Sequence, residues 1–413
     1  MPQLRIFGRQ SERNYQPRPR VLFVSHEATR TGAPKIILNI LRHFYKTCDV
    51  DCETIIHEDG HLLEEFKMFS EVHCLELPRQ KSSELQKRVR SIVKRKRSET
   101  PCIAISNSME SRFVSSILHE MGVPVVSLLH ELPCSYGDED YQMVYEQSEK
   151  IVFPVQCVRE STHKKLPIPF GKDLVMPQGL LNPHIAESID RDSARRQLRS
   201  ELGLPPEAFV VLGCGTLDMR KGIDHFANIA KAVAQKSSGT ADIHFVWVGD
   251  GPRWPHSTFH YVQIDLRLSG TAGNVHFVGE REHVDPYFVG ADLFLLPSRV
   301  DPFPCVIHEA MATELPVMAF DSSGGAAESI EDGAGFIVPY GDYALASSLI
   351  CAVSNNPGLT DGMKTKARER ISNKYRFETY ADNLVVLAES ISGHSFPRIR
   401  NLEFPVVGQR AAA

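Results

Sequence analysis

Two carboxylates with seven residues between them, Asp301 and Glu309, have the types and spacing that could do the most chemistry in this 413-residue chain. An apolar run ends at Leu296, a Pro-rich turn carries Asp301, and a pattern typical of a helix begins near Cys305. Glu309 would then lie about one turn into that helix, roughly 6 Å along its axis. Both carboxylates and the helix N-terminus can therefore face one ligand. The alternatives are a turn-forming Asp before Pro and a surface acid on the helix.

Two adjacent cations, Arg220 and Lys221, precede Gly222 in the turn after the apolar run Phe209–Leu212. A helix is expected near residues 224–235, so these cations would lie beside the positive end of its dipole, where a purely structural design would avoid them. A bound phosphate would offset that repulsion. The pattern favours a phosphate site over the alternative, a pair of solvated charges.

The first half of the chain offers a weaker candidate in the small-residue loop Thr31–Pro34. Gly32 would let the backbone approach a phosphate closely, and a helix with Pro34 in its first turn would favour an anion at its N-terminus. A structural turn explains the same residues at least as well. No G-x-G-x-x-G pattern follows any strand candidate, which argues against a nicotinamide-dependent oxidoreductase.

Apolar runs that alternate with helical stretches must position these residues. The runs fall into two successive series: Val21–Val24, Cys102–Ile105, Val123–Leu129 and Ile151–Phe153, then Phe209–Leu212, Ile243–Val248, Val275–Val278, Leu293–Leu296, Val317–Phe320 and Phe336–Val338. Alternating strands and crossover helices predict parallel sheets that are covered on both faces. Ligands gather at the carboxyl ends of such strands, so two doubly wound α/β domains predict a site in the cleft between them.

The same pattern divides the chain into segments. They are a flexible tail (1–19), a first Rossmann-like domain (20–185), a second Rossmann-like domain (186–372), a C-terminal helix (373–392) and a tail (393–413). The join is expected near residues 181–206, where Pro and Gly interrupt the alternation of strands and helices.

The composition is that of a soluble globular chain, with 42% hydrophobic residues, 23% charged residues and a formal net charge of −5. Nine cysteines lie scattered in apolar stretches without a C-x-x-C pair, which predicts reduced core thiols and no metal site. No apolar run approaches the ~18 residues needed to span a bilayer, and the N-terminus lacks an apolar signal core. These features predict a cytoplasmic protein.

A basic segment at residues 82–98 holds seven Lys and Arg around an apolar stripe of Leu85, Val89, Ile92 and Val93. This pattern predicts an amphipathic helix. Two interpretations remain open, a solvated helix resting on the sheet and peripheral contact with anionic lipid at the inner membrane face. We do not expect nucleic-acid binding, because no aromatic residues interleave with the charges.

Taken together, these motifs resemble the retaining nucleotide-sugar glycosyltransferases with the GT-B fold, family 4, also called group 1. The segment from Asp301 to Glu309, followed by Ala-Met-Ala, is similar to that family's E-x7-E signature in a D-P-F-P variant. Further similar stretches occur in the family's order over about residues 20–390: Val21–Val24 with the Gly32 loop, Leu128–Glu131, Pro177–Gly179, Lys221–Gly222, Phe245–Pro252, Val275–Gly279, Ala291–Ser298, Gly324–Glu328 and Asp332–Gly333. The resemblance implies two Rossmann-like domains that face a central cleft, the first on the acceptor side and the second binding the donor. The final helix would cross back onto the first domain.

The resemblance also implies roles for the charged residues. Lys221, with Arg220 beside it, would hold the donor diphosphate and neutralise the charge that grows as the sugar–phosphate bond breaks. Glu309 would accept hydrogen bonds from the ribose hydroxyls, and Asp301 would contact hydroxyls of the donor sugar. Positive side chains and a helix dipole would replace a metal ion.

Further donor contacts follow from the same resemblance. The loop and helix start formed by Phe303, Pro304, Cys305 and Val306 would offer backbone N–H groups to the donor. His130 would reach the donor sugar from the opposite domain, and Gly32 would leave room for the phosphate or the acceptor. The alternative for His130 is a histidine at a strand end whose hydrogen bonds are satisfied within the fold. Arg281 would stack on the nucleobase.

Three positions depart from the family pattern. The first acid is Asp301 where Glu is commoner, which shortens its reach by one methylene. Thr216 stands five residues before Lys221, where the family often has Arg. Pro304 stands where Gly is frequent and removes one backbone N–H. In addition, Glu328 either binds the sugar or ends a strand loop.

The implied activity is that of a hexosyltransferase-type enzyme, which moves a sugar from a nucleoside-diphosphate-sugar donor to an acceptor hydroxyl with retention of anomeric configuration. Neither a metal nor a separate cofactor would take part. The acceptor, whether a carbohydrate, a lipid-linked glycan or a small molecule, would belong to glycan, polysaccharide or glycolipid biosynthesis. Alternatives are a nucleotide-sugar epimerase of the same fold and a non-catalytic nucleotide-sugar-binding scaffold.

Overall fold

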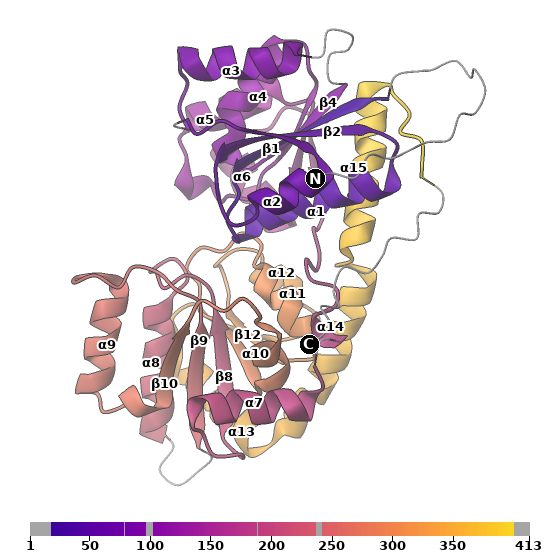
Figure 1. Cartoon of the computed structure of the whole chain (residues 1–413). Coiled ribbons are helices and arrows are strands. Elements are labelled where there is room, and N and C mark those ends of the chain that lie inside the picture. Colours follow the sequence, from indigo (N-terminus) through magenta and orange to yellow (C-terminus); the bar gives the residue numbers. More distant parts are fainter. Residues whose placement is uncertain (1–17, 78, 96–101, 188, 237–241, 400–413) are drawn as a thin grey trace, which may run out of the picture.

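The computed structural model describes residues 18–77, 79–95, 102–187, 189–236 and 242–399, and they form two lobes (Figure 1). Each lobe is built on a parallel sheet. The N-terminal sheet has seven strands in the order β3-β2-β1-β4-β5-β6-β7, and the C-terminal sheet has six in the order β10-β9-β8-β11-β12-β13. In both orders the first strand of the domain lies inside the sheet, which is the doubly wound arrangement that the alternating pattern predicts.

The N-terminal lobe contains the following elements: β1 (Arg20–Glu27), α1 (Gly32–Thr47), β2 (Asp51–Glu58), α2 (Leu63–Phe69), β3 (Glu71–Cys74), α3 (Ser83–Lys94), β4 (Ile103–Asn107), α4 (Arg112–Glu120), β5 (Val125–Leu128), α5 (Asp138–Gln147), β6 (Lys150–Phe153), α6 (Gln156–Lys165) and β7 (Asp173–Val175). The apolar pattern misses β2, β3 and β7. In β2 the reason is a buried ion pair across the strands, because Glu53 accepts hydrogen bonds from Arg20 of β1 at 2.6 and 2.7 Å. A paired charge inside the sheet breaks the apolar run by which a buried strand is identified.

The C-terminal lobe contains α7 (Arg191–Leu202), β8 (Phe209–Cys214), α8 (Ile223–Lys236), β9 (Ile243–Val248), α9 (Thr258–Leu268), β10 (Val275–Gly279), α10 (Asp285–Gly290), β11 (Leu293–Leu296), α11 (Cys305–Ala312), β12 (Val317–Phe320), α12 (Ala326–Ile330), β13 (Phe336–Val338), α13 (Tyr343–Asn355) and α14 (Asp361–Asn373). All six strands of this sheet coincide with apolar runs identified in the sequence. Each is a nearly continuous apolar run, as expected for parallel strands that are buried on both faces.

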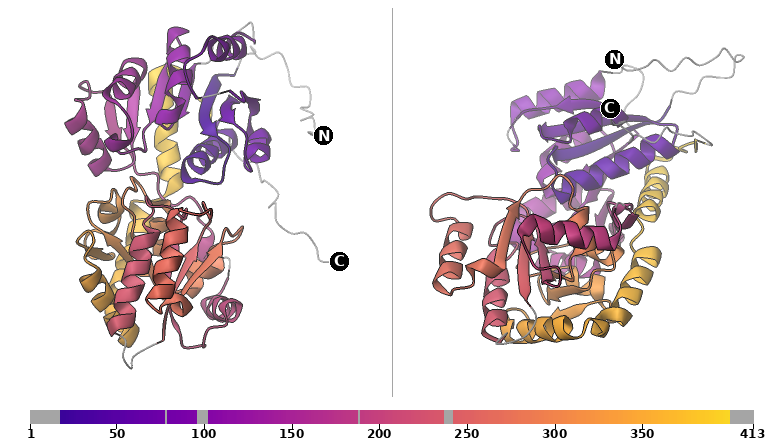
Figure 2. Two further views of the ribbon diagram at one scale, coloured as in Figure 1. Left: turned by 90° about the vertical axis from the view of Figure 1, so that its left-hand side faces the viewer. Right: turned by 60° about the horizontal axis from the view of Figure 1, so that its bottom comes forward.

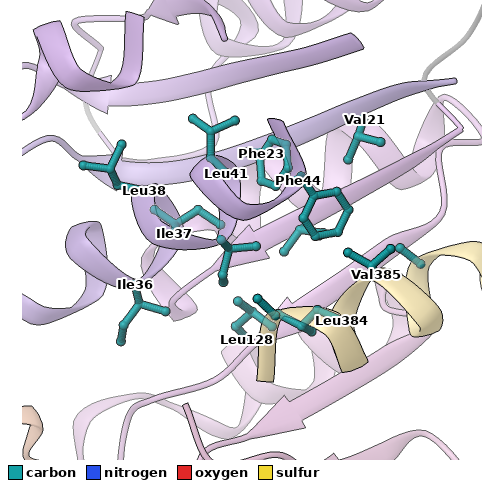
Figure 3. Close-up of a cluster of buried hydrophobic side chains, with 14 of the residues drawn as sticks. Val21, Phe23, Ile36, Ile37, Leu38, Leu41, Phe44, Leu128, Leu384 and Val385 are labelled. Atoms are coloured by element: carbon teal, nitrogen blue, oxygen red, sulfur yellow. The ribbon is translucent and has the colours of Figure 1, made fainter. Parts of the chain in front are cut away.

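The last helix, α15 (Phe377–Ser392), returns from the C-terminal lobe and packs on the N-terminal one (Figures 1 and 2). Its Leu384 and Val385 lie in the same buried cluster as Phe44 and Leu128 (Figure 3). The chain therefore passes between the lobes twice, once before α7 and once before α15.

The two passages lie side by side. Leu180 N–H donates to the carbonyl of Tyr375 at 2.9 Å. Gly179 has φ +74°, and a Cβ on it would overlap that carbonyl, so only glycine fits this close approach. We call this pair of adjacent connections the hinge.

Helix α3 carries the described part of the basic segment, while Lys96, Arg97 and Ser98 lie outside the described residues. Its apolar stripe, Leu85, Val89, Ile92 and Val93, is buried against the sheet. The charged side chains are therefore left on the outer face, as in the first of the two interpretations. No helix among the residues that the structure describes has the length and apolar character to cross a bilayer.

Candidate active site

The loops that follow β1 and β11 bring the carboxyl ends of the two sheets together. A Cβ built on Gly32, at the start of α1, would lie 3.8 Å from Sγ of Cys305, at the start of α11. Arg30 and Glu282 form an ion pair across the same gap at 3.7 Å. The N-termini of α1 and α11 thus converge, and both helix dipoles make the space between them favourable for an anion.

Lys221 and Asp301, which are 80 residues apart, meet in this space. Lys221 Nζ lies 2.6 Å from Oδ2 of Asp301, and Ser298 Oγ donates to the same oxygen at 3.3 Å. Asp301 is 5% exposed, and its N–H donates to the carbonyl of Ser323 at 2.7 Å. The structure therefore brings together the acid and the cation that the sequence singles out, and it pairs them with each other.

Arg299 connects the loop that carries Asp301 to the turn and helix start that follow β8. No motif in the sequence indicates this role. Its guanidinium donates to both carboxylate oxygens of Asp224 at 2.6 and 2.7 Å and to the carbonyl of Met219 at 2.6 Å. Burial is the largest single influence and acts to raise the pKa of Asp224, but the hydrogen bonds and charge of Arg299, together with His225 and a backbone N–H, hold that pKa below its ordinary value. This bidentate ion pair joins positions 75 residues apart, so no local motif indicates it.

The turn between β8 and α8 also needs glycine. Gly222 has φ +76°, and a Cβ on it would overlap the carbonyl oxygen of Pro297. Arg220 is exposed, and its Nη1 donates to the carbonyl of Val300 at 3.3 Å. Thr216 is exposed just beyond β8. Of these polar side chains, only that of Lys221 reaches Asp301.

Glu309 is half-buried in α11, and no hydrogen bond to its carboxylate is found within the described residues. Burial raises the pKa of Glu309 to about 7, and the positive charge of Lys35 acts in the opposite direction. Lys35 belongs to the first turn of α1, on the opposite lobe, and the sequence analysis misses it. The site thus holds a carboxylate that is free to accept hydrogen bonds from a ligand.

Two thiols line the same space. Burial, helped by the charge of Glu309, raises the pKa of Cys305 and of Cys214 to about 12, so both remain protonated. Pro304 is the residue before α11 and contributes no N–H. The first amides of the helix that can face a ligand are therefore those of Cys305 and Val306.

Phe303 has a different environment from its neighbours. Its side chain is 7% exposed and packs in a cluster with residues of the N-terminal lobe and Tyr375. Its ring centroid lies 4.6 Å from that of His308. The side chain of Phe303 thus joins the lobes instead of facing the space around Lys221.

His130 is held by hydrogen bonds within the N-terminal lobe and the hinge. Its Nε2 lies 2.6 Å from Oδ1 of Asn107, its Nδ1 lies 2.6 Å from Nε2 of Gln178, and Nδ2 of Asn107 donates to the carbonyl of Ala33 at 2.8 Å. A carbonyl can only accept, so Asn107 must present its oxygen to His130, and His130 must carry its proton on Nε2. Burial lowers the pKa of His130 to about 3, which keeps the ring neutral. Both ring nitrogens are therefore engaged, and neither is free for a sugar hydroxyl in this conformation.

Arg281 is likewise engaged, because it donates to the hydroxyl of Tyr287 at 2.9 Å and to Glu201 at 3.0 Å. These partners hold its guanidinium toward α7 and α10.

Glu328 makes a contact that neither of the two interpretations of this residue predicts. From α12 of the C-terminal lobe, its carboxylate accepts hydrogen bonds from the backbone N–H groups of Gln156 at 3.0 Å and Cys157 at 3.3 Å. These are the first two residues of α6, in the other lobe. The partners are 171 and 172 residues apart in the chain, which is why the sequence alone does not reveal the contact.

The comparisons with known proteins agree with this architecture. Residues 208–355 match the family model described as glycosyl transferases group 1. A Streptococcus pneumoniae alpha-galactosylglucosyldiacylglycerol synthase is 35% identical over 127 residues, which cover 30% of this chain and 32% of that protein. An Escherichia coli UDP-Gal:alpha-D-GlcNAc-diphosphoundecaprenol alpha-1,3-galactosyltransferase is 25% identical over 64% of this chain and 68% of its own length. The first of these matches thus spans about a third of the relative's length.

Among solved structures, the Anabaena protein Alr3699/HepE in complex with UDP and glucose superposes with a TM-score of 0.75 at 20% identity, covering 90% of this chain and 100% of that one. A WaaG structure, described as a glycosyltransferase involved in lipopolysaccharide biosynthesis, superposes with a TM-score of 0.67 at 14% identity over 91% of this chain and 100% of its own. The expected fold, with two parallel-sheet domains of the GT-B type, is confirmed. The resemblance to the group 1 glycosyltransferases is confirmed as well, through the family model over residues 208–355 and the relatives, whereas the D-P-F-P motif and retention remain predictions.

Proposed function

Because the C-terminal lobe of this GT-B chain matches the group 1 glycosyltransferases, we propose that the protein is a glycosyltransferase that takes its sugar from a nucleoside-diphosphate-sugar donor. The single observation that carries the proposal is the pairing of Lys221 with Asp301 beside the unpaired carboxylate of Glu309, at the point where α1 and α11 begin. A diphosphate needs cations and free amides, and a nucleoside and a sugar need acceptors for their hydroxyl groups. This space supplies all of them.

In the proposed complex, Lys221 exchanges its ion pair with Asp301 for the donor diphosphate, and Arg220 adds a second positive charge. The amides of Cys305 and Val306 and the dipole of α11 stabilise the oxygens on which negative charge develops as the sugar leaves. Asp301, released from Lys221, accepts hydrogen bonds from the sugar, and Glu309 accepts them from the ribose. These groups meet the electrostatic demand without a metal ion, and transfer proceeds with retention on one face of the sugar.

The opposite lobe closes the site. Gly32 leaves space beside Cys305 for the phosphate or the acceptor, and closure excludes water that would hydrolyse the donor. We assign His130 to holding the Gly32 loop in place, because its ring is bonded through Asn107 to the carbonyl of Ala33. Arg281 borders the strand ends where the nucleobase would lie, but its bonds to Tyr287 and Glu201 must break before it can stack on a base.

A panel of nucleotide sugars tested for heat stabilisation examines the donor site. A ligand at 100 times its dissociation constant adds roughly 2.7 kcal/mol to the free energy of unfolding. Lys221→Ala and Glu309→Ala should each abolish the stabilisation while the protein stays folded. Lys164→Ala and Glu207→Ala, which change exposed charges of the same kinds elsewhere, should retain it. Full stabilisation of both site variants would refute the assignment.

Product analysis separates transfer from the other reactions open to this fold. Incubation with the stabilising donor alone would give an isomeric nucleotide sugar if the protein were an epimerase. A transferase releases its nucleoside diphosphate in proportion to the acceptor added, and the anomeric configuration of the product reports retention. Binding without turnover for every acceptor would support a scaffold role.

The named relatives suggest the class of acceptor. One is a synthase of a glycosylated diacylglycerol and another acts on a diphosphoundecaprenol-linked sugar, so we propose a lipid-linked glycan as the acceptor here. Peripheral contact with an anionic membrane at its cytoplasmic face would then use the exposed cations of α3, including Lys87, Arg88 and Lys94. The contact would be electrostatic, because the apolar stripe of α3 is buried in the core.

Vesicle sedimentation tests the membrane contact. The protein should sediment with vesicles that contain anionic lipid and not with purely zwitterionic ones, and a triple Lys87→Glu, Arg88→Glu, Lys94→Glu variant should lose that difference. Absence of sedimentation of the parent protein with either vesicle would end the idea.

A further inference from the structure

The contact between Glu328 and α6 supplies a helix cap that the N-terminal lobe itself lacks. Helix α6 begins at Gln156, and the preceding residue, Val155, has the extended backbone of an N-cap but no side-chain group that can accept a hydrogen bond. The first N–H groups of a helix have no partner inside the helix. Here the carboxylate of Glu328 accepts from the first two, at 3.0 and 3.3 Å. A negative charge at this end also interacts favourably with the helix dipole.

The short helix that carries Glu328 lies flush against the N-terminal lobe. A Cβ on Gly325, the residue before α12, would lie 3.0 Å from Cγ2 of Val155 and 2.5 Å from the carbonyl oxygen of Pro302. Behind Glu328, its own carbonyl accepts from Arg370 at 2.9 Å and from the hydroxyl of Tyr375 at 3.3 Å. Glu328 is therefore held at its backbone carbonyl by Arg370 and Tyr375 and at its carboxylate by α6.

The same helix start holds the loop of Asp301. Gly325 N–H donates to the carbonyls of Pro302 at 2.9 Å and Asp301 at 3.3 Å, and Asp301 N–H donates to Ser323 at 2.7 Å. Asp301 and Gly324 form an isolated parallel bridge. Hydrogen bonds at both ends of the backbone segment 325–328 thus connect α6, through Glu328 and the start of α12, to Asp301, and Asp301 in turn contacts Lys221.

We propose that Glu328 is a positioning residue that couples closure of the two lobes to the placement of Asp301 in the donor site. When the lobes close, Glu328 caps α6, the start of α12 is fixed, and the Asp301 loop takes the geometry seen here. When they open, the cap is lost, and the start of α12, which bonds the Asp301 loop, is no longer fixed from the N-terminal lobe. This inference rests on the proposed function for its catalytic meaning, whereas the mechanical coupling can be measured without any substrate.

Amide hydrogen exchange reports both ends of the coupling. In the parent, the amides of Gln156 and Cys157 at one end and of Asp301 and Gly325 at the other should be protected. Glu328→Ala should speed exchange more than tenfold at both ends, whereas Glu369→Ala, which removes an exposed acid of α14, should change neither. Faster exchange at α6 alone, or at neither end, would overturn the coupling.

A second substitution separates capping from coupling. Thr is a good N-cap residue and has nearly the shape of Val, so Val155→Thr in the Glu328→Ala background gives α6 a cap of its own. Protection of Cys157, the second residue of the helix, should return because the N-cap side chain bonds the N–H of the second or third residue, while the Asp301 end stays unprotected. Recovery of both ends would show that Glu328 serves only the stability of α6, which would overturn the proposal.

Kinetics supply the functional readout. The probe is whichever of UDP, GDP and ADP stabilises the parent most. Glu328→Ala should change the dissociation constant of this diphosphate less than threefold, because Lys221 and Glu309 remain, but should lower kcat about tenfold or more. Val155→Thr should not restore kcat. An unchanged kcat in Glu328→Ala would contradict the positioning role. If instead the protein transfers no sugar but Glu328→Ala speeds amide exchange at both ends, the proposed function is wrong and the coupling still holds.

Discussion

The two lobes use the polar residues around the starts of α1 and α11 in opposite ways, and these two sets of residues are called here the N-terminal wall and the C-terminal wall of the site. On the C-terminal wall, Glu309 has no hydrogen-bond partner among the described residues and Arg220 is exposed. On the N-terminal wall, both nitrogens of His130 are engaged, and the half-buried carboxylate of Glu131 accepts from Ser108 and from the amides of Met109 and His130. The first wall presents groups to a ligand, and the second uses similar groups to hold its own loops. Residue type alone does not distinguish these two uses.

The largest effect is expected from the ion pair of Lys221 with Asp301 on the C-terminal wall. Asp301→Asn removes the charge of the acid and frees Lys221. Transfer should fall about 100-fold, which is typical for loss of one group that acts on the reacting sugar. Affinity for the nucleoside diphosphate alone, measured by calorimetry, should stay the same or increase, because Lys221 no longer has a competing partner. Equal losses in both measurements would show that Asp301 only maintains the loop.

The second-largest effect is expected from a change in the backbone that supports the Asp301 loop. Gly324→Ala places a Cβ on the carbonyl oxygen of Asp301 at φ +132°, and should lower the free energy of unfolding by about 2–3 kcal/mol. Gly122→Ala on the other lobe is the matched control, because Gly122 has φ +76° but open space around it. It should cost only about 1 kcal/mol from backbone strain. Chemical denaturation measures both, and equal losses would mean that close packing of the Asp301 loop adds nothing.

A third test uses the unpaired acid. Burial raises the pKa of Glu309 to about 7, above its ordinary value of 4.5, so between these two values the unfolded chain loses the proton before the folded protein does. The parent should therefore lose stability as pH rises from about 5 to 8, by about 1–2 kcal/mol relative to Glu309→Gln. Glu207→Gln, an exposed acid, should show no such difference. If the difference in unfolding free energy between the parent and Glu309→Gln did not change over this pH range, Glu309 would be solvated in the free protein.

The smallest effect is expected on the N-terminal wall. Gln178→Glu replaces the amide that donates to Nδ1 of His130 by a carboxylate that can only accept. His130 should then carry a proton on Nδ1, its pKa should rise from about 3, and kcat should fall about threefold to tenfold. Nitrogen-15 chemical shifts of the ring report the tautomer, with the exposed Gln142→Glu as control. An unchanged tautomer would contradict the assignment of His130 to hydrogen bonds with Asn107 and Gln178.

The contrast between the walls also explains what the sequence could predict. Parallel strands that are buried on both faces appear as apolar runs, so the six strands of the C-terminal sheet and the cations and acids that follow them were predicted from local pattern. Strand β2 was not predicted, because Glu53, paired with Arg20 inside the sheet, interrupts its apolar run. Long-range contacts were missed for one shared reason, because each joins residues that are distant in the chain. They are the contacts of Arg299, Lys35 and Glu328. His130 was identified by position, but its hydrogen-bond partners on β4 and the hinge were not predictable.

The two passages between the lobes, bonded to each other at Leu180 and Tyr375, define how the molecule can move. Two adjacent tethers permit a swing about the line through them and resist twisting or sliding in other directions. Gly179 lets the two connections lie close together, since a side chain there would overlap the backbone of Tyr375 and push the connections apart. The same connections contact the site, because Gln178 bonds His130 and the ring of Tyr375 packs against His308, so a change in the connections would also change the side chains around Asp301 and Glu309.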